Sequence, residues 1–160
     1  MLAVRHLHAP ELREGTQMRI AERLLGALLI LGAGIILFYW WSYFTGGDVM
    51  VLRERWYAAF ESSFPVADGW MALCMLAGGA GFLQGRRFAV PFGFMAGASL
   101  TYLAAMDVTF DVENGLYTLA AQNGAMKFEL FINISSILLG AATIAASWRA
   151  LARERQPPNG

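Results

Sequence analysis

Four long apolar stretches, separated by shorter polar segments, dominate the hydrophobic pattern of the chain. They cover residues 24–44, 66–84, 88–107 and 128–148, and the first of them contains no charged residue. A helix that crosses a bilayer needs about 20 mostly apolar residues, so each stretch is long enough to span a membrane. The pattern predicts an all-α fold, an integral membrane four-helix bundle in one domain over residues 24–148.

The segments between the stretches indicate how the helices are connected. The second and third stretches are joined only by Gly85-Arg86-Arg87, so we expect antiparallel neighbours. In the segment 45–65, Leu52, Trp56 and Phe60 recur every four residues. This spacing predicts a short amphipathic helix over about 49–62. It lies either in the plane of the membrane interface or as a cap packed on the end of the bundle.

The basic residues predict the orientation of the chain. With the amino terminus in the cytoplasm, nine arginines lie inside and three basic residues, Arg53, Arg55 and Lys127, lie outside. Cytoplasmic loops carry the excess of Lys and Arg in membrane proteins. We therefore expect a multi-pass protein of the cell (inner or plasma) membrane, with residues 1–23 as a cytoplasmic amino-terminal segment and 149–160 as a cytoplasmic tail.

Small residues mark the predicted contacts between helices. The third stretch contains Gly93-x-x-x-Gly97, and the fourth places Ser136 and Gly140 on one face. In membranes, such residues allow two helix backbones to approach closely. They serve either the interior of the bundle or a contact with another membrane protein or a second copy of the chain.

Polar residues form one layer near the outer ends of the predicted helices. With a rise of about 1.5 Å per residue, Asp107 and Glu129 lie roughly 29 Å from the cytoplasmic end, Asp68 about 24 Å and Asn133 about 23 Å. The hydrocarbon core is about 30 Å thick, so all of them lie at or just below its outer boundary. Ionisable groups at this depth usually face the bundle interior.

Two interpretations of this layer remain open. Either Asp68, Asp107, Glu129 and Asn133, with Trp70 nearby, form a ligand-binding site, or each acid simply marks the wet end of a helix. Asp111 and Glu113 are expected beyond the hydrocarbon and solvated. Lys127 and Arg53 or Arg55 are the nearest candidate counter-ions for the acids.

The composition of the chain argues against a soluble domain, a nucleic-acid-binding protein and a cysteine-based site. The chain is 57% hydrophobic and only 15% charged, against about 25% charged in a typical soluble domain. Its net charge of zero provides no basic surface for nucleic acid. The single cysteine excludes a disulfide within the chain and a multi-cysteine metal site. No motif indicates a catalytic residue, a metal site or a cofactor, which favours a non-enzymatic function and leaves an enzyme open.

Two short motifs carry a resemblance to a known family. "FYW" at Phe38 to Trp40, followed by "FESSFPVADGW" at Phe60 to Trp70, resembles small four-span bacterial membrane proteins related to YvaD, a family of unknown function. The resemblance covers about residues 30–110. It implies four spans and singles out Asp68 as the matching acid of the second span. A more distant analogy connects the chain with EXPERA-type bundles, in which intramembrane acids surround a lipophilic ligand.

These observations leave two functional hypotheses. The first is an accessory or assembly subunit of a larger membrane complex. The alternative is a binder or isomerase-like protein for a small lipophilic molecule, held in an acidic pocket on the outer side. Both make the lipid bilayer the first partner of the chain. A common cavity for Asp68, Asp107 and Glu129 would favour the second hypothesis.

Overall fold

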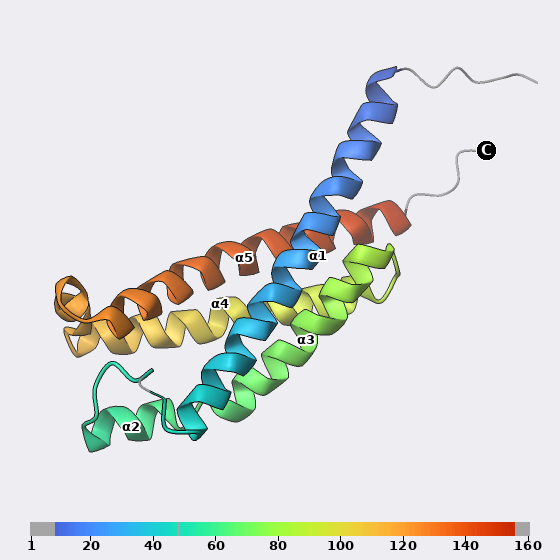
Figure 1. The fold of residues 1–160 in the computed structure, drawn as a ribbon. Helices are drawn as coiled ribbons and strands as arrows, with labels where there is room; N and C mark the ends of the chain where they lie inside the picture. The colour runs from blue at the N-terminus through green and yellow to red at the C-terminus, as the bar shows by residue number, and fades with distance from the viewer. Residues whose placement is uncertain (1–8, 48, 156–160) are drawn as a thin grey trace, which may run out of the picture.

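All regular structure in the described part of the chain is helical (Figure 1). The computed structural model describes residues 9–47 and 49–155. The rest of the predicted terminal segments, residues 1–8 and 156–160, lies outside this description. The elements are α1 (Ala9–Phe44), α2 (Arg55–Glu61), α3 (Pro65–Gln84), α4 (Ala89–Glu113), the 3-10 helix η1 (Leu116–Ala121) and α5 (Gly124–Glu154).

Four of these segments are long and apolar enough to cross a membrane, as predicted. The fold is therefore all-α with four long apolar helices, compatible with a helical bundle. Their bounds differ from the apolar stretches, because helical structure continues into more polar sequence. The largest consequence is at α4, which runs on to Glu113. Asp107 therefore lies within a helix and does not mark its end.

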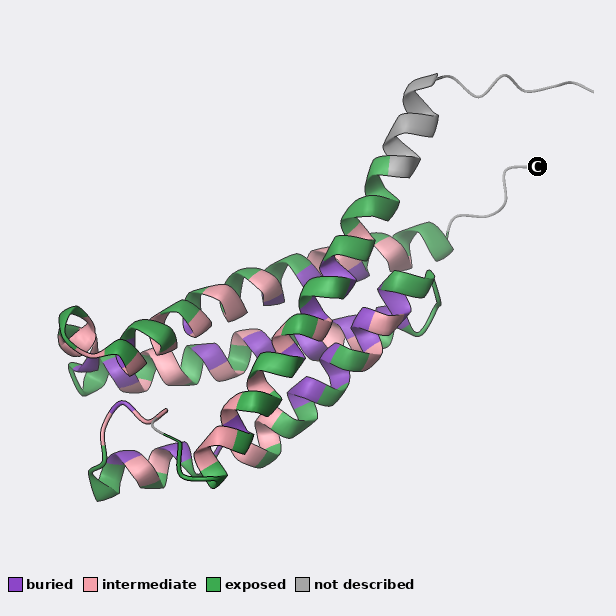
Figure 2. Cartoon of the chain, in the orientation of Figure 1, coloured by how far each residue is buried: buried purple, intermediate pink, exposed green. Residues whose placement is uncertain are grey.

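The long helices pack as two pairs that cross each other. α1 lies along α3 and α4 lies along α5, while α3 and α4 connect the pairs. In Figure 1 the pairs diverge toward the side that carries α2 and η1, which we call the cap end. The opposite side carries the loop between α3 and α4, and we call it the arginine end. Figure 2 shows that many of the buried residues lie on α3 and α4.

A tight turn at the arginine end makes α3 and α4 antiparallel neighbours, as predicted. α3 ends at Gly85, whose φ of 64° is left-handed and favours glycine. The Arg86 N–H then donates to the Gly81 carbonyl at 2.9 Å, and the Gly85 N–H donates to that of Phe82. These bonds satisfy carbonyls at the end of α3 and reverse the chain within four residues.

Close helix packing depends on glycines at the crossing of α4 and α5. A Cβ atom added at Gly97 would lie 2.8 Å from the Gly140 carbonyl oxygen. One added at Gly140 would lie 2.9 Å from the carbonyl oxygen of Gly97. Gly93, a turn earlier, lies against the Ser147 side chain. The structure thus places these three glycines inside the bundle, whereas Ser136 lines a cavity described below.

The segment between α1 and α3 folds back as a cap on the end of the bundle. Its helix, α2, has only seven residues, so the predicted helix over 49–62 is too long. Its buried residues are Tyr57 and Glu61, whereas Trp56 of the predicted apolar stripe is 46% exposed. Phe60 stacks on Phe110 of α4, with ring centroids 3.5 Å apart. Of the two predicted placements, these contacts correspond to a cap packed on the end of the bundle.

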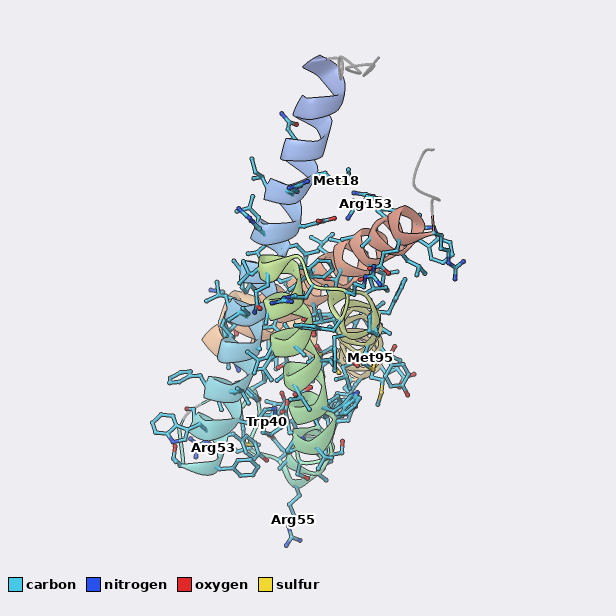
Figure 3. All side chains as sticks on the ribbon, turned by 90° about the vertical axis from the view of Figure 1, so that its right-hand side faces the viewer. Met18, Trp40, Arg53, Arg55, Met95 and Arg153 are labelled. Carbon is cyan, nitrogen blue, oxygen red and sulfur yellow. The ribbon has the colours of Figure 1, made fainter. Side chains whose placement is uncertain are left out.

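Two polar contacts fix the cap and the opposite end. Asn123 begins α5: its Oδ1 accepts from the Ala125 and Met126 N–H groups, and its Nδ2 donates to the Val51 carbonyl at 2.9 Å. The start of α5 is thereby tied to the segment before α2. At the arginine end, Arg153 of α5, labelled in Figure 3, forms an ion pair with Glu22 of α1.

Candidate functional site: an acidic cavity at the cap end

A cavity of about 100 Å³ lies between the helices at the cap end. Four carboxylates line it, one from each of α2, α3, α4 and α5: Glu61, Asp68, Asp107 and Glu129. A single water needs about 10–15 Å³ on this measure. The cavity therefore has room for several waters or for a small chemical group.

Asp68 is positioned by the start of α3. Pro65 occupies the first turn, where its missing N–H is not needed, and the acid three residues later lies at the positive end of the helix dipole. The side chain also has a fixed partner from α1. Trp40 Nε1 donates to Asp68 Oδ2 at 2.8 Å, across 28 residues of sequence. This hydrogen bond joins the aromatic end of α1 to the start of α3.

Glu61 is a site residue that the sequence interpretation missed. It belongs to α2 and lies off the apolar stripe of Leu52, Trp56 and Phe60, yet it is buried and lines the cavity. Tyr39 of α1 donates to Glu61 Oε2 at 3.0 Å, and Tyr57 donates to Glu61 Oε1 at 2.7 Å. The spacing of Tyr57 and Glu61, one helical turn apart, was the signal available in the sequence.

Glu129 and Asn133 lie one turn apart on α5 and both face the cavity. The Tyr57 hydroxyl oxygen lies 3.0 Å from Glu129 Oε2, which links the cap to α5 across 72 residues. Asn133 is 1% exposed, and its Nδ2 has no hydrogen-bond partner. It lies close to Asp107 of α4, without a hydrogen bond of normal geometry. The predicted residues Asp68, Asp107, Glu129 and Asn133 are thus brought together at one cavity.

Asp111 contradicts the expectation that it is solvated. It is 0% exposed, and neither of its carboxylate oxygens has a hydrogen-bond partner. The expectation was wrong because α4 continues past Asp107 and η1 folds over its last turns, next to Glu129 and Tyr117. Burial, followed by the charge of Asp111, raises the pKa of Tyr117 to about 12, so this phenol stays protonated. Glu113 is exposed, as expected.

No basic side chain lines the cavity among the described residues. Lys127 and Arg53, two of the predicted counter-ions, are exposed. Arg55 is also exposed and extends away from the bundle (Figure 3). The remaining walls are mostly apolar, with Ile36, Met71, Leu100, Leu103 and Ile132 among them. A strongly acidic site is therefore surrounded by apolar side chains.

Two further results limit the site. Trp70 is 52% exposed and is not part of the cavity wall, so the structure does not bring it to the other predicted residues. Within the described ranges, no group of three or more acidic, histidine or cysteine side chains is arranged to hold a metal ion.

Comparison with known proteins adds no relative: no family model, no curated protein and no solved structure matches the chain. The resemblance to the YvaD-related proteins stays a prediction.

Proposed function

We propose that the chain is a multi-pass membrane protein that binds a small lipophilic molecule in the acidic cavity. The observation that carries this proposal is the convergence of Glu61, Asp68, Asp107 and Glu129, from four different helices, on one cavity with apolar walls. A few polar groups converging in an apolar pocket are typical of small-molecule sites. Ionisable residues at membrane depth usually serve a function because they are costly to maintain.

The accessory-subunit hypothesis has weaker support. It depended partly on small-residue faces left free for a partner. Gly93, Gly97 and Gly140 instead contact neighbouring helices within the chain. A binding role for the cavity also gives the four buried or half-buried acids a use that a purely structural subunit would not need.

We place the cap end outside the cytoplasm, because the positively charged loop Gly85–Phe88 and the carboxyl-terminal turn of α5 lie at the opposite end. Cysteine labelling tests this orientation in the Cys74→Ala background, which removes the buried native thiol. In intact cells, a membrane-impermeant maleimide is expected to label Arg55→Cys at once and Arg86→Cys only after permeabilisation. Both positions are exposed, so access depends on the side of the membrane. The reverse pattern would show that the orientation is wrong.

The binding proposal is tested by the molecules that co-purify with the protein from its native membrane. Mass spectrometry of the extracted wild-type protein is expected to find one lipophilic molecule in a stoichiometric amount. The variants Asp68→Asn and Asp107→Asn are each expected to retain at least about 10-fold less, since a hydrogen bond to a charged group contributes about 1.5–3 kcal/mol.

Glu113, an exposed acid of α4, the helix that also carries Asp107, provides the matched control. Glu113→Gln removes one negative charge near the cap end without touching the cavity, and is expected to retain the molecule like the wild type. Thermal unfolding of each variant shows whether the bundle has formed. Unchanged retention in both aspartate variants would refute the binding site. A stoichiometric protein in place of a small molecule would favour the accessory subunit.

A further inference from the structure

The hydrogen bonds at the cap end determine how many protons the acids hold. Tyr57 Oη lies 2.7 Å from Glu61 Oε1 and 3.0 Å from Glu129 Oε2. A phenol has a single proton and donates it to only one acceptor. The second contact is a hydrogen bond only when that carboxyl group is protonated and donates to the phenol oxygen. At least one of Glu61 and Glu129 therefore carries a proton.

The remaining contacts show which glutamate keeps the negative charge. Glu61 accepts a second hydrogen bond, from the Tyr39 hydroxyl, and its bond from Tyr57 is the shorter one. Short hydrogen bonds from neutral donors are typical of an ionised acceptor. The chain of bonds thus runs from a protonated Glu129 to Tyr57 and on to an ionised Glu61, which also accepts from Tyr39.

The surroundings explain why Glu129 carries the proton. The carboxylates of Asp107 and Asp111 on α4 and of Glu61 on α2 lie near enough to Glu129 for their negative charges to repel its own. From α3 comes Asp68, another acid of the same cavity wall. The other polar neighbours are neutral: Tyr57 on α2, Tyr39 on α1, Asn133 on α5, and Tyr117 on η1 beside Asp111. A half-buried carboxylate facing only negative and neutral groups is costly to ionise.

The cavity also contains a buried polar group without a partner. Asn133 Nδ2 is enclosed and makes no hydrogen bond, although Asn133 lines the cavity. A buried donor without a hydrogen-bond partner destabilises the folded protein. This destabilisation is removed when an occupant of the cavity presents an oxygen, its own or that of a water it brings, to the amide. The acids and this amide together indicate that the site is completed by something bound in it.

We infer that the bound molecule is a lipophilic amine in its protonated form, and that its ammonium group replaces the proton held by Glu129. The inference rests on the proposed binding function and names the class of its ligand. An ammonium group among four carboxylates supplies the positive charge that the cavity wall lacks. The rings of Tyr39 and Trp40, which also line the cavity, favour a cation over a neutral group.

The exchange balances in atoms and charge. An ammonium ion enters and pairs with the carboxylate of Glu129, and the proton of Glu129 leaves to the solvent. The net charge within the cavity is therefore unchanged by binding. Because one proton is released, affinity for the amine is expected to rise about tenfold per pH unit wherever the free protein holds that proton and the amine is still protonated.

Calorimetry with hexylamine tests the inference on the full chain in lipid nanodiscs. Titrations in buffers of different ionisation enthalpy count the protons released on binding. One proton is expected per hexylamine bound to the wild type. Glu129→Gln, a neutral mimic of the protonated side chain, is expected to bind hexylamine and release none. Glu113→Gln, the exposed control, is expected to release one proton like the wild type.

Hexan-1-ol provides a readout that does not depend on the folding of any variant. It has the same chain without a charge, and is expected to bind the wild type at least about 10-fold more weakly. Absence of hexylamine binding, binding of it without proton release, equal affinity for hexan-1-ol, or undiminished proton release from Glu129→Gln would each overturn the inference. A neutral molecule retained from the native membrane and lost in Asp68→Asn would refute the amine and leave the proposed binding function intact.

Discussion

Gly97→Leu is expected to disrupt the packing of α4 on α5 and to lower the free energy of unfolding by about 3 kcal/mol or more. A Cβ atom at this position would lie 2.7 Å from Ile144 Cγ1 and 2.8 Å from the Gly140 carbonyl oxygen. The carbonyl belongs to the backbone, so relief of the clash requires the helices to move apart. Separation of the helices would also open the cavity wall that α4 and α5 share.

Equilibrium unfolding in detergent, followed by circular dichroism and tryptophan fluorescence, measures this effect. Gly34→Leu in α1 is the control, because no atom outside its own helix lies within 4 Å of a Cβ added there. Its unfolding free energy is expected to stay within about 0.5 kcal/mol of the wild type or to rise. Equal losses at the two positions would show that the α4–α5 crossing does not depend on close contact.

Tyr57→Phe is expected to cost about 3 kcal/mol of stability, although it removes a single oxygen atom. This hydroxyl is buried and contacts both Glu61 and Glu129. Hydrogen bonds that involve a charged group contribute about 1.5–3 kcal/mol, and their loss leaves two acids facing each other without the bridging group. The cap is expected to detach first, since Tyr57 links it to Glu129 of α5.

Tyr117→Phe is the matched control for this prediction. Its hydroxyl oxygen is also buried but has no hydrogen-bond partner, so its removal is expected to leave stability unchanged or slightly higher. Hydrogen exchange of the cap amides, residues 49–61, separates local detachment from global unfolding. Tyr57→Phe with normal stability and unchanged exchange in the cap would contradict the hydrogen-bond chain through this residue.

The helical architecture could be predicted because it follows from local properties of the chain. Runs of apolar residues specify the long helices, and the depth of Asp68, Asp107, Glu129 and Asn133 follows from the helical rise. In a small bundle of antiparallel helices, polar side chains at the same depth that face the interior lie close to one another. Their arrangement around one cavity is therefore close to what simple geometry suggests.

The cap could not be predicted in the same way. The spacing of Trp56 and Phe60 indicated an apolar stripe, but the deepest residue of α2 is Tyr57, whose hydroxyl reaches acids on two elements. This burial depends on contacts across 72 residues, which periodicity does not encode. Asp111 was misplaced for the same reason, because the fold of η1 over α4 covers a carboxylate that a straight helix would expose.

The acids of the cap end lower the stability of the folded protein unless something bound compensates for them. Asp111 is buried without a hydrogen-bond partner, and four other carboxylates line a cavity with no basic residue among its described walls. Replacing buried charges by apolar residues often stabilises a protein. A bound cation would pair with the same carboxylates, and this pairing would provide the affinity of the site.

The most direct measurement is an experimental density map of the wild-type protein extracted in native lipid. We predict density of a non-protein molecule in the cavity, with one end within hydrogen-bond distance of Asp68, Asp107 or Glu129 and an apolar part against Leu100 and Ile132. A cavity filled only by water, or by side chains that close it, would contradict the claim that this site binds a small lipophilic molecule.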